Sequence, residues 1–396
     1  MKYISTERAN LFEPDVYITF VAEFSGNITA EKLAEAVKAA YAANESTMSE
    51  IVLEKDGSAY YRKNENSGCK VSFDERPWQE IINDSRRMPF AIDQGELVRT
   101  FISSHGNGIS LIIHAHHLVG DGKSIVILLK DIAAALDGTE PEYKPMLLID
   151  DKYLSERSKF PTGCKLILKN VNRKWAKCGK SFTWDDYYAI HEKYHQRHLS
   201  VPIIETYNVV ELKESCPKGI TLNSFIITKL LSENPDYAVT GIPVSIRENN
   251  NSMSNQVSGI SLKYRYNSCI TYEENLEVFH KMLKNKISKQ LYKYFVLHFM
   301  ECLSPSIIDA VLMQTHGCYS CKLSEKMAHI MGYTDKNSRD LGVTNLGVID
   351  IEPNHKNYEI KDIIFIPPKV SYTKNVVGVS TFGGKLTVCK NEIIKI

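Results

Sequence analysis

The segment from residue 97 to residue 136 constrains the fold more than any other part of the chain. Residues 97–103 and 110–115 are short runs rich in apolar and β-branched side chains, which is typical of strands. Residues 124–136 carry apolar side chains at helical spacing, so a helix should follow. Between the second strand and this helix lies the sequence HHLVGDG, residues 116–122. Because connections between secondary-structure elements commonly carry catalytic groups, this loop is the first candidate for a functional site.

Predicted strands and helices alternate along the rest of the chain. In the first half we expect a strand at 15–25, a helix after Thr29, a hairpin of 51–54 with 58–62, and a helix at 76–87. In the second half we expect helices at 221–233 and through most of 271–316, and strands at 238–246, 260–266, 341–351, 362–366, 376–381 and 385–389. This order lacks the regular βαβ alternation of a nucleotide-binding fold. It predicts an α/β (α+β) class with a mixed sheet flanked by helices in each half.

Length and composition indicate a globular chain of two units. At about 150 residues per unit, 396 residues suggest two to three units, and we take two. A proline-rich stretch of mixed charge at 137–161 is the expected boundary, which divides the chain into 1–160 and 161–396. Hydrophobic residues make up 43% of the chain and charged residues 24%, as in ordinary globular proteins. The formal net charge of +1 gives no global electrostatic basis for binding nucleic acid.

Features of the sequence also predict the compartment. The first residues lack the apolar run of a signal peptide, and no run of 18 apolar residues occurs. The nine cysteines are an odd number scattered over a long chain, which is typical of reduced thiols. We therefore expect a cytoplasmic protein without a transmembrane segment. We also expect a monomer.

His117 is the candidate general base. A histidine with an ordinary pKa of about 6.5 can accept a proton from an alcohol or amine and return it to a leaving thiolate. Gly122 would let an extended substrate pass close to the backbone, and Asp121 could fix the loop by pairing with an arginine. Two alternatives stay open at this point. The loop could be a tight turn that merely contains two histidines, or His114 and His116 could bind a metal together with Asp121.

Three further features of the sequence bear on its function. Cys318 and Cys321, with His316 just before them, suggest a structural zinc, but a second ligand pair is not evident and no metal is expected. The absence of Walker-type, GxGxxG and GxSxG motifs disfavours ATP hydrolysis, nicotinamide chemistry and serine hydrolysis. Residues 165–180 hold six basic residues and no acidic one, a pattern typical of a solvated helix face. This face could attract CoA phosphates, an acidic carrier protein or, weakly, an anionic membrane surface.

Residues 116–122 resemble the HHxxxDG signature of the CoA-dependent and carrier-protein-dependent acyltransferases. This superfamily includes chloramphenicol acetyltransferase, the condensation domains of peptide synthetases, polyketide-associated acyltransferases and bacterial alcohol acetyltransferases. Upstream, residues 89–99 are similar to the family segment PFxxxxGxLxR. Downstream, residues 241–247 resemble its strand ending in arginine, and residues 343–347 (VTNLG) resemble a further family segment. Because these segments occur in family order, the resemblance covers most of the chain.

The resemblance implies a fold and a set of site residues. The fold would be two chloramphenicol acetyltransferase-like subdomains arranged in a V, with a central tunnel and the catalytic histidine at its middle. His117 matches the catalytic base of the family. Asp121, which we group with His117 as a catalytic residue, matches an aspartate that has a structural role in the family. The arginine that pairs with this aspartate would be Arg247. His116 and Gly122 would support the site.

The resemblance also implies a reaction. An acyl group would pass from CoA, or from the phosphopantetheine thioester of an acyl carrier protein, to a small alcohol or amine. Thr344 or Asn345 could contact the oxyanion or line the tunnel. Because the thioester is a co-substrate, no permanently bound cofactor is expected. The alternative is a catalytically silent member of the family that binds a carrier protein or a small ligand.

Overall fold

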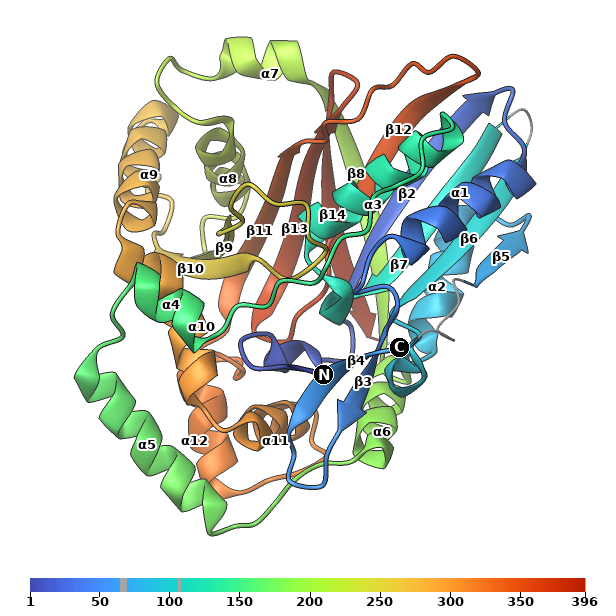
Figure 1. Cartoon of the computed structure of the whole chain (residues 1–396). Coiled ribbons are helices and arrows are strands. Elements are labelled where there is room, and N and C mark those ends of the chain that lie inside the picture. The colour runs from blue at the N-terminus through green and yellow to red at the C-terminus, as the bar shows by residue number, and fades with distance from the viewer. Residues whose placement is uncertain (65–69, 106–107, 396) are drawn as a thin grey trace.

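The computed structural model describes residues 1–64, 70–105 and 108–395, and two large sheets lie beside each other in it (Figure 1). The N-terminal sheet has five strands in the order β12-β2-β7-β6-β5. These strands are β2 (Tyr17–Gly26), β5 (Val71–Asp74), β6 (Val98–His105), β7 (Gly108–His116) and β12 (Tyr358–Ile366). Neighbouring strands are antiparallel, except that β5 and β6 are parallel. A strand from near the C-terminus, β12, therefore forms one edge of the N-terminal sheet.

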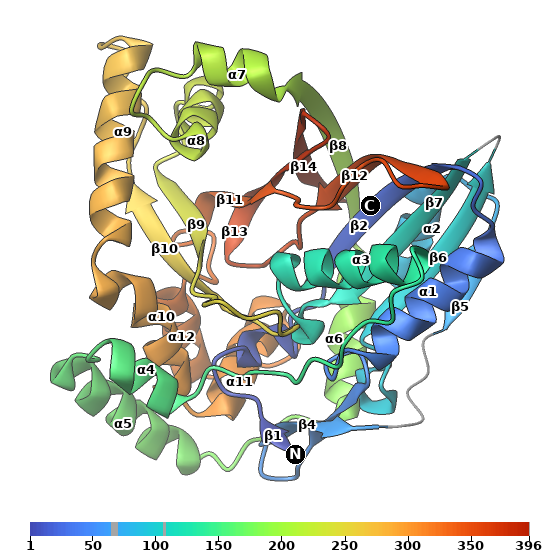
Figure 2. The same cartoon turned by 45° about the horizontal axis from the view of Figure 1, so that its top comes forward.

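Helices cover both faces of the N-terminal sheet. The helices α1 (Ala30–Ala42) and α3 (Gly122–Leu136) pack on one face, and α2 (Trp78–Arg87) packs on the other (Figure 2). Side chains along β7 alternate between these faces: Ile113 packs with the α1 and α3 side, whereas Ile112 packs with α2. The same alternation places His114 and His116 on the α2 side.

The C-terminal sheet has six strands in the order β10-β9-β11-β13-β14-β8. They are β8 (His198–Asn208), β9 (Val239–Ser245), β10 (Val257–Lys263), β11 (Arg339–Val348), β13 (Thr373–Phe382) and β14 (Lys385–Lys395). The strand β11 runs parallel to β9 and β13, and the other neighbours are antiparallel. The helices α8 (Leu222–Glu233) and α9 (Tyr272–Ile287) pack their apolar side chains on this sheet.

The remaining elements lie below the two sheets in Figure 1 or around their edges. The strands β1 (Lys2–Tyr3), β3 (Ser49–Leu53) and β4 (Ala59–Lys63) form a small sheet. The other helices are α4 (Asp151–Arg157), α5 (Thr162–Ala176), α6 (Trp184–His195), α7 (Val209–Ser215), α10 (Gln290–Cys302), α11 (Pro305–Thr315) and α12 (Lys322–Met331), with the 3-10 turns η1 (Arg8–Asn10), η2 (Ile92–Gln94) and η3 (His117–Val119). No described helix is by itself long and apolar enough to cross a bilayer; α10 and α11 pass that test only as a pair, bent by 98°.

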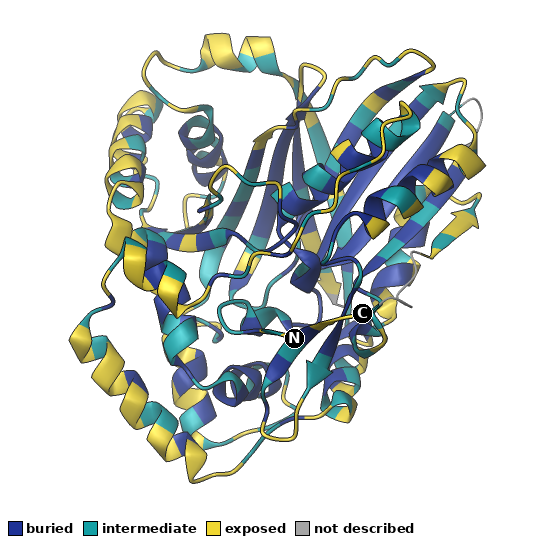
Figure 3. Cartoon of the chain, in the orientation of Figure 1, coloured by how far each residue is buried: buried dark blue, intermediate teal, exposed yellow. Residues whose placement is uncertain are grey.

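The main apolar core is shared by residues from both ends of the chain. It joins Ile18 and Ile125 with Ile307, Leu346 and Phe365. Figure 3 shows buried residues, in dark blue, along the strands of both sheets. The division into 1–160 and 161–396 stays a prediction. Because the two sheets share this core, the loop after β7 and the loop after β9 are held close to each other.

Most of the predicted elements are confirmed, including the mixed-sheet α/β class, the strand at 15–25, the hairpin of β3 and β4, and the helix α8. The strand predicted at 260–266 is shifted, because its partner β9 begins at Val239 and pairs there with Lys263. The long helical region 271–316 is three helices, interrupted near Lys289 and again just before Pro305. The edge strand β8 was missed, since it contains a proline and lacks a clear apolar alternation.

Candidate active site

The candidate site is the loop that joins β7 to α3. β7 ends at His116, the turn η3 begins at His117, and α3 begins at Gly122. His117 is partly exposed although the residues on both sides of it are buried. Its backbone N–H donates to the carbonyl of Val16 at 3.0 Å, which attaches the loop to the neighbouring chain segment. The fold thus presents one accessible imidazole at the end of a central strand.

Among the described residues, the ring of His117 is held through Nδ1. Its Nδ1 lies 2.8 Å from Oδ1 of Asn255. The side-chain amide of Asn255 donates to the backbone carbonyl of His117 at 2.7 Å and to Oε2 of Glu7 at 2.5 Å. The hydroxyl of Tyr61 lies 2.9 Å from the other carboxylate oxygen of Glu7. Within the described parts of the chain, Nε2 of His117 has no hydrogen-bond partner.

The surroundings of the His117 ring favour its neutral form. Burial lowers the pKa of His117, and the charge of Asp121 together with the hydrogen bonds at the ring offsets only part of that effect. Burial also raises the pKa of Glu7 to about 7, although Asn255 and Tyr61 donate hydrogen bonds to it. A neutral imidazole with a free nitrogen can accept a proton.

His116 has a different environment from His117. It is fully buried, and its Nδ1 accepts a hydrogen bond from the backbone N–H of Leu118 at 3.2 Å. The ring packs near those of Tyr17 and Phe90, and burial lowers its pKa to about 3. These contacts give His116 a packing role below the loop.

The two metal hypotheses find no support in the geometry. His114 lies on the same face of β7 as His116, but its Nδ1 is bonded to the hydroxyl of Thr19 at 2.8 Å. Cys321 accepts a hydrogen bond from the N–H of Ser324 and caps α12. Across the residues that the structure describes, no three or more His, Cys, Asp or Glu side chains are arranged to hold a metal ion.

Asp121 is buried and begins α3. Its carboxylate accepts from the backbone N–H of Ser124 at 2.9 Å, which forms a capping box with that serine. It also accepts from the N–H of Gln256 at 2.9 Å and forms an ion pair with Arg247, whose Nη2 lies 3.0 and 3.2 Å from the two oxygens. Among the hydrogen bonds and ion pairs of the described residues, none joins this carboxylate to the ring of His117. Its partners indicate that Asp121 supports the loop.

Residues 247–256 connect β9 to β10 and reach across from the C-terminal sheet to the start of α3, as the segment after β9 shows in Figure 2. Arg247 donates to the carbonyls of Ser252 and Ser254 as well as to Asp121. The hydroxyl of Ser124 donates to the carbonyl of Ser254 at 3.0 Å. We call residues 247–256 the docking loop, because it fastens the C-terminal half to the candidate site.

Two glycines allow the close packing at this point. Gly120 has φ +150°, and a Cβ there would lie 2.5 Å from the side chain of Ser124. A Cβ on Gly122 would lie 2.6 Å from a methyl group of Leu346. The first glycine permits the capping box, and the second permits β11 to pass close to the N-terminus of α3.

Thr344 and Asn345 lie on β11, which passes this loop. Because side chains alternate along a strand, Thr344 shares a face with Leu346, the residue that contacts Gly122. Asn345 instead accepts from the N–H of Gly347 at 2.8 Å and donates to a side chain on α8. Of the two, Thr344 is on the side of the candidate site.

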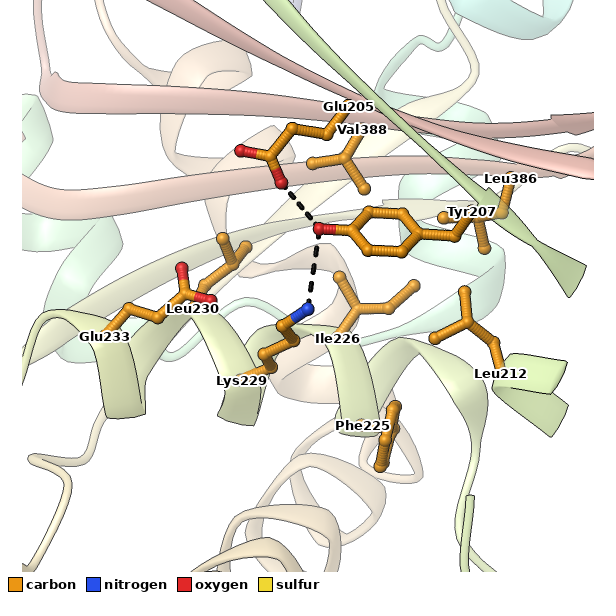
Figure 4. A pocket seen from close by; sticks show the side chains of 10 residues that line it. All are labelled: Glu205, Tyr207, Leu212, Phe225, Ile226, Lys229, Leu230, Glu233, Leu386 and Val388. Carbon is orange, nitrogen blue, oxygen red and sulfur yellow. Dashed lines mark hydrogen bonds between the residues drawn. The ribbon is translucent and has the colours of Figure 1, made fainter. Parts of the chain in front are cut away.

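A separate cavity lies on the C-terminal sheet, away from His117. It has a volume of about 20 Å³, room for about one water molecule, and lies between α8 and the strands β8 and β14 (Figure 4). Tyr207 in its wall donates to Glu205 at 2.5 Å and lies 3.4 Å from Nζ of Lys229. Its small size makes it unsuitable for an acyl substrate.

Sequence reasoning pointed to His117, Asp121 and Arg247, and the structure brings their backbone segments together. It missed Glu7 and Asn255. Asn255 could have been suspected because it stands in a polar stretch just before a predicted strand. The sequence around Glu7 carries no comparable signal, because that residue reaches the site only through tertiary packing.

Comparison with known proteins identifies the fold. Residues 12–155 match the family described as Condensation domain. Polyketide synthase associated protein 5 from Mycobacterium tuberculosis superposes with a TM-score of 0.62 at 12% identity, covering 99% of this chain and 92% of that one. The first condensation domain of the CDA synthetase gives 0.60 at 12% identity, covering 98% and 87%. This chain has the condensation-domain fold. The resemblance inferred from its motifs is therefore confirmed.

Two further relatives place this condensation-domain fold in context. A starter condensation domain of rhizomide synthetase RzmA, in complex with C8-CoA and Leu-SNAC, has a TM-score of 0.62 at 11% identity and covers 99% of this chain and 88% of its own. Surfactin synthase subunit 1 of Bacillus subtilis (strain 168) is 26% identical over 122 residues, which is 30% of this chain and 3% of that protein. Condensation domains generally catalyse acyl transfer.

Proposed function

We propose that this protein is an acyltransferase that moves an acyl group from a CoA or carrier-protein thioester to an alcohol or amine. The observation that carries the proposal is the geometry at His117: a partly exposed imidazole whose Nδ1 is held by Asn255 while Nε2 has no hydrogen-bond partner among the described residues. Burial lowers the pKa of this ring, which favours its neutral form. A base of this kind suits proton transfer near neutral pH. The condensation-domain fold supports the same reaction class.

In the proposed reaction, Nε2 of His117 takes the proton from the acceptor O–H or N–H as that atom attacks the thioester carbonyl. The tetrahedral oxyanion collapses, the C–S bond breaks, and the imidazolium returns its proton to the thiolate. The new ester or amide and a free thiol are the products, so no covalent acyl-enzyme is required. Thr344 is the proposed oxyanion contact, because it lies on the face of β11 that passes Gly122.

The proposed donor is a diffusible or carrier-bound pantetheine thioester, and nothing in the reaction requires a resident cofactor. The RzmA starter domain contains C8-CoA in its structure, which supports an acyl-CoA donor for this fold. The cytoplasm is the proposed compartment, since the eight cysteines in the described residues are all unpaired thiols.

Replacement of His117 by alanine tests the function. Release of free thiol from a panel of acyl-CoAs and alcohols should fall by about 10²–10⁴-fold, the usual contribution of a general base. The exposed His329 on α12 supplies a matched control, and His329→Ala should keep wild-type turnover. Near-normal turnover in a folded His117→Ala protein would exclude His117 as the base.

The alternative is a catalytically silent condensation fold that binds a carrier protein or ligand. The same panel separates the two functions. A silent protein would bind acyl-CoA or a carrier protein with equal affinity before and after His117→Ala and would release no thiol in either form. The intact His117, Asp121 and Gly122 support the catalytic reading.

The helix α5 is the proposed contact for an anionic surface. It lies at the periphery of the molecule and is mostly exposed (Figure 3), and residues 165–180 carry six basic side chains. Leu166 and Ile167 are each 64% exposed on the same helix, which suits a membrane surface better than a free CoA phosphate. Lys169→Glu with Arg173→Glu should abolish sedimentation with phosphatidylserine vesicles. An unchanged vesicle-bound fraction, or a raised KM for acyl-CoA instead, would reject the membrane contact.

A further inference from the structure

We infer that Asn255 and Glu7 are positioning residues that hold His117 in the tautomer with hydrogen on Nδ1. This inference rests on the proposed function, because it matters only if Nε2 has to accept a proton. The three side chains come from distant parts of the chain: Glu7 and Asn255 are 248 positions apart, and His117 and Asn255 are 138 apart. No motif in the sequence links them.

The hydrogen bonds fix the orientation of the Asn255 amide. Its Nδ2 lies 2.7 Å from the backbone carbonyl of His117, and a carbonyl oxygen can only accept. The NH₂ group must therefore face that carbonyl, whatever the protonation state of Glu7. Its second hydrogen points to Oε2 of Glu7 at 2.5 Å.

This orientation then determines the tautomer of His117. With the NH₂ group committed, the atom of Asn255 that faces Nδ1 is the carbonyl oxygen Oδ1, at 2.8 Å. An oxygen acceptor at that distance requires a hydrogen on Nδ1, so in the neutral ring Nε2 carries the lone pair. The opposite tautomer would place two acceptors against each other and leave Nε2 unable to act as a base.

Glu7 is itself held in place. The next residue, Arg8, is fully buried and donates to both oxygens of Asp309 at 2.8 and 2.5 Å. Tyr61 on β4 lies 2.9 Å from the second oxygen of Glu7. The carboxylate thus has a fixed backbone on one side and a hydroxyl on the other, and it can keep Asn255 from rotating.

Charged and titratable groups near the His117 ring influence its pKa. The charged or titratable groups around it are Asp121 at the start of α3, the neighbouring His116, and Glu7 on the far side of Asn255. Of these, Asp121 favours the protonated ring, as does the hydrogen bond from the ring to Asn255. A change at position 255 should therefore be visible in the pH profile as well as in the rate.

The test reads the ring nitrogens directly. Protein labelled with ¹⁵N-histidine gives a long-range ¹H–¹⁵N spectrum in which bare and protonated ring nitrogens differ, and His117→Ala identifies the signals of His117. The wild-type ring should show hydrogen on Nδ1. Asn255→Ala should show a mixture of both tautomers, with kcat lowered roughly 10- to 100-fold, a part of the base's contribution, and KM for the acyl donor unchanged. The matched control is Asn249→Ala, because Asn249 is an exposed residue of the docking loop. This substitution should change neither the tautomer of His117 nor kcat.

A second variant keeps the inference open to refutation if alanine at position 255 prevents folding. Asn255→Asp retains an oxygen for Nδ1 and adds a negative charge, so it should keep the tautomer and move the acid limb of the pH–rate profile upward. An unchanged spectrum and kcat in Asn255→Ala, or an unmoved acid limb in Asn255→Asp, would overturn the inference. If the tautomer shifts in Asn255→Ala but His117→Ala leaves turnover intact, the positioning holds and the proposed function fails.

Discussion

Arg247→Ala should lower both the stability of the protein and its activity. Arg247 is mostly buried and holds the carboxylate of Asp121, which is itself buried. It also donates to the carbonyls of Ser252 and Ser254, so a single guanidinium fastens the docking loop to the first turn of α3. Alanine would leave Asp121 as a buried charge without its cation.

The size of the effect follows from this burial. Removing one partner of a buried ion pair usually costs about 3–5 kcal/mol, because the other charge remains buried. The unfolding entropy near 60 °C is about 2.1 cal/mol/K per residue, or about 0.8 kcal/mol/K for 396 residues, so the Tm should fall by roughly 4–6 °C. Turnover should fall on the order of 10²-fold, the cost of misplacing a catalytic group by about 1 Å.

Calorimetry and the thiol-release assay check this prediction together. The control is Lys130→Ala. Lys130 lies on α3, the helix that Arg247 holds through Asp121, and forms an exposed ion pair with Asp350. Loss of this ion pair should lower the stability by at most about 1 kcal/mol. The reasoning is refuted if Arg247→Ala melts within about 1 °C of the wild-type protein. Lost turnover with an unchanged Tm would assign Arg247 a direct chemical role instead.

Three other outcomes are expected. Because burial lowers the pKa of His117 and only the neutral ring accepts a proton, kcat/KM should fall on acidification with an inflection below pH 6.5, and an inflection above 7 would contradict this. Burial also holds the pKa of His116 at about 3, and those of His114 and His191 well below 6.5. The unfolded chain binds these protons near pH 6.5, so the stability that each buried neutral histidine contributes is fully present above that pH and is lost below it. For His116 the loss at pH 5 is about 2 kcal/mol. Equal urea midpoints at pH 5 and 7.5 would rule this out. Gly120→Ala should cost at least about 1–3 kcal/mol through backbone strain and the contact with Ser124, measured by urea unfolding, and a wild-type midpoint would contradict the tight turn.

Local sequence was sufficient for the elements whose signals lie within a few residues. Apolar spacing predicted α3 and α8, and the pair Asp56-Gly57 predicted the hairpin of β3 and β4. Apolar patterns on both sides of residues 116–122 likewise predicted that this loop joins a strand to a helix. Boundaries were less well predicted, as in β10, because the end of a strand depends on where its partner begins.

The partners of His117 required the folded molecule. Sequence patterns alone indicate a histidine between a strand and a helix, followed by glycines that permit a tight turn and an aspartate that can cap the helix. The contacts of Asn255 with Nδ1 and of Glu7 with Asn255 depend on tertiary packing, because they join segments 138 and 248 positions apart. Periodicity and turn chemistry act over a few residues, whereas these hydrogen bonds depend on how the docking loop and the N-terminal segment pack against the end of β7.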